Sequence, residues 1–241
     1  MKPTIKLAVT RTPDGGEMEL YQHDHDFLIN VNGKELMNSR RHESELGLAR
    51  LGCAHLSDYQ SARVLVGGLG MGYTLRQALD MLRPDAGVVV CELLPAVVEW
   101  NCKILGQLNN HPLTDQRTEL VIGDVFELIT RSTAGFDAIL LDIDNGPFAI
   151  TDTANQRLYG LAGIQACRRA LRKLGRLAVW SSEPSPKFEQ LLRNCGFHVR
   201  RHEVAAHRGR RSKMCFVWVA VEDKTLLSGK DQERVPAVQS G

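Results

Sequence analysis

Acidic side chains in the middle of the sequence follow short apolar runs, where they could bind a ligand. Glu92 is suited to accept hydrogen bonds from the vicinal hydroxyls of a ribose, because an acidic residue performs this role in nucleotide-binding α/β units. Asp124 could accept a hydrogen bond from an adenine amine, with Val125 as an apolar neighbour for the ring. The alternative for Asp124 is the N-cap of a helix that begins at Val125.

Two further carboxylates, Asp142 and Asp144, follow the apolar run Phe136–Leu141. Asp142 is the candidate general base, because a carboxylate there could orient and deprotonate an amine and stabilise a nearby sulfonium. Asp144 is a candidate substrate-binding residue. The alternative for both is structural, with Asp144 opening a turn and Asp142 capping it.

A glycine-rich segment follows the apolar run Val64–Val66 and precedes the helical pattern Thr74–Leu82. Its glycines are Gly67, Gly68, Gly70 and Gly72. Glycine lets the backbone turn tightly and approach a ligand closely, so we predict that the last three contact a nucleotide-type cofactor. A dinucleotide fingerprint would end in glycine at position 73, which is Tyr73, so the spacing disfavours NAD without excluding it. A purely structural strand-to-helix turn is the alternative.

The elements that must hold these residues form an α/β pattern. Apolar runs without polar alternation recur between helix-length segments: Val64–Val66, Val88–Cys91, Leu120–Ile122, Ala138–Leu141 and Leu177–Trp180. Such runs predict parallel strands buried on both faces, with ligands bound at their carboxyl ends. His198–Val204 and Met214–Val221 predict an antiparallel hairpin that closes the sheet.

The first part of the chain has a different pattern. Turn-forming residues at Pro13–Gly16 and Asn32–Gly33 separate short apolar runs, which predicts a small β-meander. A helix is expected over Glu43–His55. We therefore divide the chain into an N-terminal meander and helix (1–56), a nucleoside-binding catalytic domain (57–222) and a polar tail expected to fray (223–241).

The composition excludes several classes of protein. Lys and Arg total 30 against 28 for Asp and Glu, so no global field favours nucleic acid or an anionic membrane as a partner. The start of the chain lacks the unbroken apolar core of a signal peptide, and no stretch approaches the roughly 20 apolar residues of a transmembrane helix, which predicts a cytoplasmic location. The six cysteines form no C-x-x-C pair and are expected to be buried, reduced thiols.

Two polar clusters are ambiguous. Adjacent residues of His23–Asp26 would point to opposite faces of a strand, which favours a solvated strand end over a metal site, and we expect no metal. The basic segment His207–Lys213 joins the last two strands and could either be solvated or bind an anionic substrate group. Trp180 could line a pocket but is more typical of a core.

Several segments together resemble the spermidine synthase family in order and spacing: VLVGGLGMGYTLR, VVVCEL, LVIGDVFELI, FDAILLDIDNGP and ALRKLGRLAVWSSEPS. The resemblance runs from about Leu28 to Val219, and NGKELMNSRRHESELGLARLG is similar to that family's N-terminal segment. It implies a Rossmann-like class I methyltransferase sheet and a homodimer. It also implies that Gly68, Gly70, Glu92 and Asp124 bind the nucleoside, that Asp142 is the catalytic aspartate, and that His42 and Glu43 contact substrate.

The activity implied by the resemblance is aminopropyl transfer from decarboxylated S-adenosylmethionine to a small amine, in polyamine biosynthesis. Two departures weaken it. The family's glycine loop usually has an aspartate for the donor's amine where this sequence has Met71, and Arg41 replaces a tyrosine before His42. Both changes disfavour a polycationic amine. Methyl transfer from intact S-adenosylmethionine and nucleotide binding without turnover are therefore the alternatives.

Overall fold

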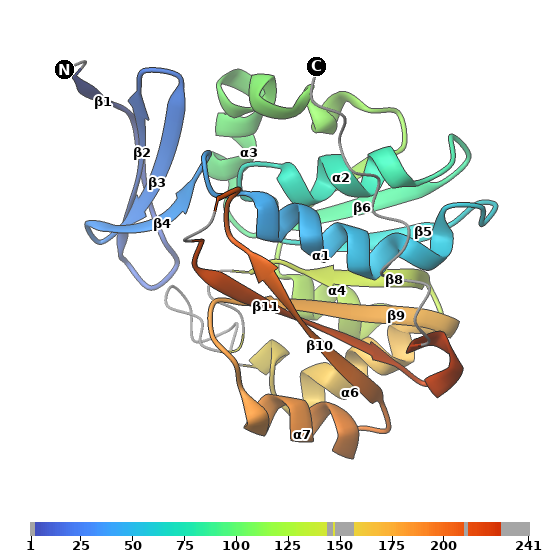
Figure 1. Cartoon of the computed structure of the whole chain (residues 1–241). Coiled ribbons are helices and arrows are strands. Elements are labelled where there is room, and N and C mark those ends of the chain that lie inside the picture. The colour runs from blue at the N-terminus through green and yellow to red at the C-terminus, as the bar shows by residue number, and fades with distance from the viewer. Residues whose placement is uncertain (1–2, 144–146, 148–156, 210–211, 228–241) are drawn as a thin grey trace.

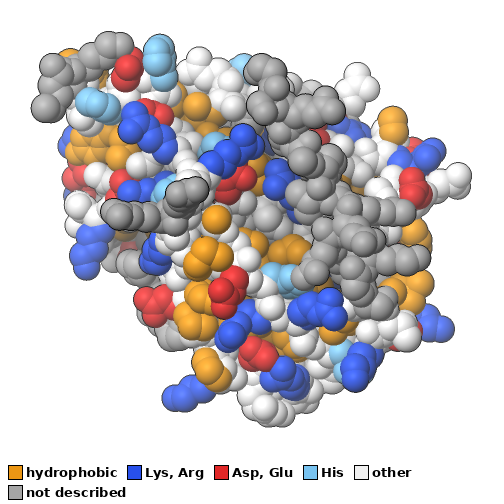
Figure 2. Space-filling view, in the orientation of Figure 1, with side chains coloured by type: hydrophobic (Ala, Val, Ile, Leu, Met, Phe, Trp, Pro, Cys, Tyr) orange, Lys and Arg blue, Asp and Glu red, His pale blue; other side chains and the backbone are white. Residues whose placement is uncertain are grey.

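The computed structural model describes residues 3–143, 147, 157–209 and 212–227 (Figure 1). These residues form a four-stranded antiparallel sheet and a seven-stranded, mostly parallel sheet. On the face seen in Figure 2, basic and acidic side chains are interspersed, in keeping with the balanced charge of the chain.

The four-stranded sheet is the predicted meander, extended by one strand at its N-terminal edge. Its strands lie in sequence order: β1 (Thr4–Arg11), β2 (Glu17–His23), β3 (Asp26–Val31) and β4 (Lys34–Asn38). Asn32 and Gly33 both have positive φ, 50° and 74°, which fits the tight hairpin turn predicted there. His23 and Asp26 pair across the preceding turn, between β2 and β3.

The seven-stranded sheet has the order β10-β11-β9-β8-β5-β6-β7. Its strands are β5 (Arg63–Gly67), β6 (Gly87–Glu92), β7 (Thr118–Ile122), β8 (Phe136–Leu141), β9 (Leu171–Ser181), β10 (His198–Ala205) and β11 (Met214–Val221). The predicted parallel sheet and terminal antiparallel hairpin are confirmed. The prediction that every apolar run is buried on both faces is wrong for β7, where Leu120 is 38% and Ile122 52% exposed, because β7 is the edge strand.

Helices cover both faces of this sheet (Figure 1). One core contains α1 (Glu43–Cys53), α2 (Tyr73–Met81) and α3 (Pro95–Lys103). The other contains α4 (Val125–Arg131), α6 (Leu161–Ala170) and α7 (Pro186–Asn194). The short 3₁₀ segments are η1 (Ala54–Leu56), η2 (Leu105–Asn109), η3 (Pro112–Thr114) and η5 (Lys224–Leu227).

The first of these cores continues into the inner face of the N-terminal sheet. Met18, Leu20 and Ile29 belong to the same buried cluster as Leu48 of α1 and Leu75 of α2. The N-terminal sheet is therefore packed against the larger domain, at the end of the central sheet where the ligand was predicted to bind.

Three expectations need correction or qualification. The tail does not fray directly after Glu222, because η5 packs against the sheet with Leu227 buried, and the Arg176 guanidinium donates to the Leu226 carbonyl at 2.9 Å. Residues 228–241 lie outside the described residues. Five cysteines are buried free thiols as predicted, whereas Cys102 is exposed on α3. Trp180 packs against the buried core.

Within the described residues, no helix is both long and apolar enough to span a membrane. In the same residues, no group of three or more His, Cys, Asp and Glu side chains is arranged to hold a metal ion.

Candidate functional site

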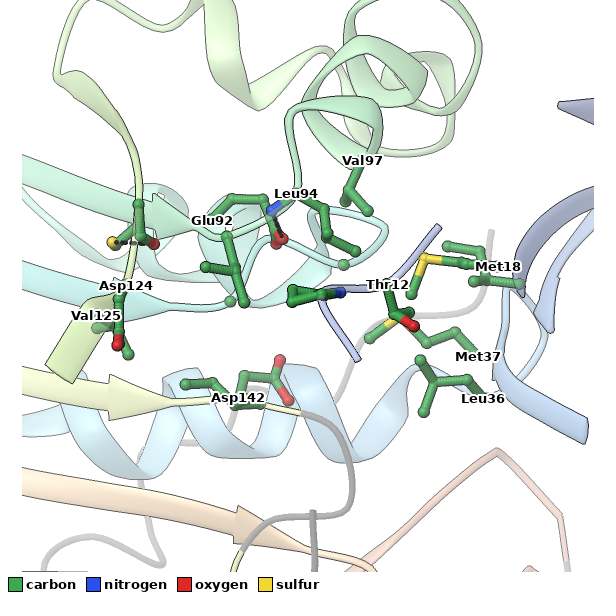
Figure 3. A pocket seen from close by; sticks show the side chains of 18 residues that line it. Thr12, Met18, Leu36, Met37, Glu92, Leu94, Val97, Asp124, Val125 and Asp142 are labelled. Atoms are coloured by element: carbon green, nitrogen blue, oxygen red, sulfur yellow. Dashed lines mark hydrogen bonds between the residues drawn. The ribbon is translucent and has the colours of Figure 1, made fainter. Parts of the chain in front are cut away.

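A pocket lies at the carboxyl ends of β5, β6 and β8, under the inner face of the N-terminal sheet (Figure 3). It contains about 810 Å³ of empty space, including the part open to solvent. Three of the predicted carboxylates line it, Glu92, Asp124 and Asp142. The parallel sheet thus brings together residues that are far apart in the sequence, as predicted for ligand sites of open α/β sheets.

The glycine loop forms one wall of this pocket through Gly68 and Gly70. Gly68 has φ +93°, and a Cβ there would lie 2.2 Å from the backbone oxygen of Asp142, so a side chain cannot be accommodated. Gly70 has φ +52° and faces the Met37 side chain of β4. Glycine at these positions therefore lets β5 turn close to β8 and leaves the backbone open to a ligand.

Gly72, which we predicted to contact the cofactor, is not among the residues that line the pocket. It precedes α2 with φ +85°, and a Cβ there would meet the amides of Asn101 and Asn109 behind the loop. Asn101 donates to the Gly70 carbonyl at 2.8 Å, and Asn109 donates to the Met71 carbonyl at 2.8 Å. These two asparagines stabilise the loop on the side that faces away from the pocket. Nothing in the sequence indicated this role.

Glu92 ends β6 and is only 8% exposed. One carboxylate oxygen accepts from the Leu69 backbone N–H and the other from the Leu94 backbone N–H, both at 2.9 Å. These bonds tie the carboxylate to the glycine loop and fix its orientation in the pocket wall. Each oxygen has a second lone pair, so the group can also accept from ligand hydroxyls.

Asp124 both caps a helix and lines the pocket. Its side chain is the N-cap of α4, accepting from the Phe126 backbone N–H at 2.8 Å, so the capping interpretation is confirmed. It also lines the pocket beside Val125. Its other oxygen lies 3.1 Å from the Arg157 guanidinium, which stacks over the Phe126 ring. Arg157 was not found from the sequence.

Asp142 directly follows β8 and lines the pocket, with one oxygen accepting a short hydrogen bond from the Thr74 hydroxyl. Burial raises the pKa of Asp142 to about 6, and the bond from Thr74 opposes that rise. The carboxyl group is therefore mostly ionised at neutral pH but can be protonated near it, which suits a general base. Thr74 was missed, although it lies in the first turn after the glycine loop.

A second carboxyl group, Glu45 of α1, also interacts with Asp142. Burial raises the pKa of Glu45 well above its usual range, and the charge of Asp142 raises it further. The Thr74 hydroxyl lies 3.4 Å from the Glu45 backbone carbonyl, so α1 and α2 meet next to Asp142. Sequence reasoning placed this helix but assigned no role to Glu45.

The predicted substrate residues His42 and Glu43 lie outside this pocket. The His42 ring stacks on Tyr73 at 4.2 Å, and Glu43 accepts from Arg208 at 2.7 Å. Both line a separate surface hollow with Arg40, Arg41, His207 and Arg208. Asp144 lies outside the described residues.

The interpretation of Met71 as the residue at the donor's amine is wrong. Met71 is 1% exposed and belongs to the hydrophobic core, and it is not among the residues that line the pocket. Gly70 is the neighbouring loop residue that faces the pocket. Arg41 lies in the surface hollow and pairs with Glu35 at 3.1 Å.

Comparisons with known proteins agree with this arrangement. Residues 51–192 match the family model described as the spermine/spermidine synthase domain. A polyamine aminopropyltransferase of Saccharolobus islandicus is 30% identical over 126 residues, which is 52% of this chain and 40% of that protein. One of Sulfolobus acidocaldarius is 27% identical over 122 residues, 51% of this chain and 39% of that protein. The matched part therefore spans about two fifths of the length of these curated relatives.

Solved structures support the fold. A spermidine synthase in complex with the transition-state analogue AdoDATO has a TM-score of 0.74 and 20% identity, covering 98% of this chain and 79% of that one. The spermidine synthase from Thermotoga maritima has the same TM-score and coverage with 22% identity. The predicted Rossmann-like class I methyltransferase fold with a small N-terminal sheet is confirmed.

Proposed function

Because the chain belongs to the spermine/spermidine synthase family, we propose that it transfers an aminopropyl group from decarboxylated S-adenosylmethionine to a small amine. The observation that carries the proposal is Asp142, a carboxylate of raised pKa that lines the same pocket as the glycine loop and Glu92. The aminopropyltransferases to which the chain is similar support the choice of this reaction.

The donor would bind along the wall that the central strands provide. Asp124 and Val125 would contact the adenine, and Glu92 would accept from the ribose hydroxyls. Gly68 and Gly70 leave room for the sulfonium and its substituents, since neither presents a side chain. A carboxylate beside a sulfonium stabilises its positive charge by direct electrostatic attraction.

In the reaction, the nitrogen lone pair of the acceptor forms a bond to the aminopropyl carbon attached to sulfur. The carbon–sulfur bond breaks, its electrons remain on sulfur, and the sulfonium becomes the neutral thioether methylthioadenosine. Asp142 would orient the amine by accepting a hydrogen bond and would take up the proton that the nitrogen loses. The protein thus contributes alignment and a base, while the donor contributes the leaving group.

Methyl transfer from intact S-adenosylmethionine is the second candidate. It is favoured by Gly70, because the loop residue that faces the pocket carries no carboxylate to repel the carboxylate group that only the intact donor has. The products distinguish the two reactions: aminopropyl transfer releases methylthioadenosine, whereas methyl transfer releases S-adenosylhomocysteine.

The test has two stages. Thermal unfolding with each of S-adenosylmethionine, its decarboxylated form, methylthioadenosine and NAD identifies which ligand binds the folded protein, since a ligand at 100 times its Kd stabilises by about 2.7 kcal/mol. Product analysis with mixed amines then identifies the reaction. Stabilisation by NAD alone would refute the proposal. Binding of adenosyl ligands with no product from either donor would support the third candidate, a binding protein without turnover.

A homodimer and a cytoplasmic location remain proposals that follow from the family and from the sequence. Size-exclusion chromatography with light scattering tests the first, and cell fractionation tests the second. A monomer at micromolar concentration would contradict the dimer.

A further inference from the structure

The part of the pocket that the N-terminal sheet lines is apolar, unlike the part lined by Glu92, Asp124 and Asp142. We call it the apolar chamber, and its wall consists of Met18, Ile29, Leu36, Met37, Leu94 and Val97. The first four come from the N-terminal sheet and the last two from the segment after β6 (Figure 3). Met18, Ile29 and Val97 are buried, so the chamber wall is continuous with the core.

Met37 determines how far the chamber extends toward the glycine loop. A Cβ on Gly70 would lie 2.6 Å from the Met37 methyl carbon and 3.0 Å from its sulfur. The thioether therefore fills the space that a side chain at position 70 would need. A flexible methionine at this point gives the chamber an apolar and adaptable end.

Charge is absent from the chamber wall as far as the structure describes it. The acidic residues among the described lining of the whole pocket are Glu92, Asp124 and Asp142. Glu92 already accepts two backbone N–H groups, and Asp124 caps α4 and pairs with Arg157.

Asp142 is therefore the described carboxylate best placed to pair with an ammonium at the mouth of the chamber. In Figure 3 the Asp142 side chain lies below Glu92, and its carboxyl group points toward the side of the pocket where Leu36 and Met37 lie. Thr12, which lines the same pocket, uses its hydroxyl to donate to Asp14.

We propose that the acceptor is a monoamine with an apolar body, whose nitrogen lies at Asp142 and whose hydrocarbon part fills the apolar chamber. This inference rests on the proposed function for the identity of the reacting nitrogen. A second ammonium at the far end of the acceptor would lose its hydration among apolar side chains without gaining a partner among the described residues there, which is costly. A hydrocarbon chain gains free energy from the same surroundings.

The wild-type protein tests this directly. With the nucleoside site saturated by methylthioadenosine, calorimetry measures the Kd of n-alkylamines from propylamine to hexylamine and of the α,ω-diamines of equal length. The Kd of the alkylamines should fall about fourfold per added methylene until the chamber is full. Each diamine should bind at least about tenfold more weakly than the alkylamine of its length.

Variants locate the effect. In Met37→Ala, the Kd should go on falling up to a longer alkylamine than in the wild-type protein, because the chamber is larger. Met37→Asp or Leu36→Asp should shift the preference toward diamines by about tenfold or more. Met214→Ala is the matched control, because Met214 is an exposed methionine at the start of β11 that does not line the pocket, and it should change neither.

The possible failures are distinguishable. If methylthioadenosine binds and diamines bind as tightly as alkylamines, or chain length has no effect, the inference is overturned while the proposed function stands. If methylthioadenosine does not bind, the proposed function fails and the inference fails with it. Turnover with the same amines provides a second readout, in which kcat/KM should follow the order of affinities.

Discussion

Replacing Asp142 by Asn should make the protein more stable and almost inactive, because the property that suits Asp142 to catalysis also destabilises the fold. Its pKa rises from the ordinary value of 3.8 to about 6. One pKa unit corresponds to about 1.4 kcal/mol, and the pKa of Asp142 rises by about two units. Ionising Asp142 therefore costs about 3 kcal/mol more in the folded protein than in the unfolded chain. The side chain is half-buried, so solvent screening reduces this, and we expect a gain of about 1–3 kcal/mol.

The pH dependence follows from the same values. The folded state holds the Asp142 proton up to about pH 6, whereas the unfolded chain releases it near pH 3.8, so the folded state binds more protons between these values. The Asp142 contribution therefore lowers stability as pH rises through this window and is fully unfavourable above about pH 6. The advantage of Asp142→Asn should be largest near pH 8 and small near pH 4.

Urea unfolding of both proteins at several pH values measures this difference. Methylthioadenosine affinity should stay nearly unchanged in Asp142→Asn, while turnover falls by roughly 10²–10⁴-fold, the usual contribution of a general base. Thr74→Val is an informative companion, since losing the hydroxyl removes the bond that opposes the rise and should raise the pKa of Asp142 further. A stability difference that is absent, or equal at pH 4 and pH 8, would refute the reasoning.

Three other substitutions test the site. Glu92→Ala should weaken methylthioadenosine binding by more than about tenfold, since a charged hydrogen bond contributes about 1.5–3 kcal/mol, and unchanged affinity by calorimetry would contradict this. Met71→Asp should cost several kcal/mol or prevent folding, because it buries an unpaired charge in the core, whereas Met71→Leu should cost under about 1.5 kcal/mol. Gly68→Ala should lower the free energy of unfolding, measured with urea, by at least about 2 kcal/mol. The control Gly87→Ala should lower it by under about 1 kcal/mol, because a Cβ at position 87 would have open space around it. Equal losses would rule out the close approach of the Gly68 backbone to β8.

The sequence predicted the order of elements well because each inner strand is an unbroken apolar run and each turn has its own residue preference. Asn32–Gly33 predicted a hairpin from two residues, and both adopt the positive φ that this turn requires. The edge position of β7 was not predictable in this way, because Leu120 and Ile122 are as apolar as residues of an inner strand. Which strand lies at the edge depends on the topology of the whole sheet.

The pocket was predictable only where its residues follow strands of the central sheet. Glu92 and Asp142 were found because both directly follow such strands. Thr74 and Glu45 lie on helices, and their approach to Asp142 depends on how α1 and α2 pack. The Met71 interpretation failed for a related reason: neighbouring residues of a loop point in different directions, and only the backbone conformation determines which one faces the ligand.

Some residues of the pocket lie within the segment that matches the family model, and others precede it. The match spans residues 51–192, which include Gly68, Glu92, Asp124 and Asp142. The chamber residues of the N-terminal sheet, such as Met18 and Met37, precede this segment although the fold there is shared with solved spermidine synthases. Family membership therefore supports the donor chemistry more strongly than the choice of acceptor. A protein can change its acceptor through substitutions on the N-terminal sheet while keeping the donor wall intact, because the two groups of residues lie on separate elements. The amine series is consequently the measurement on which the identity of the substrate depends.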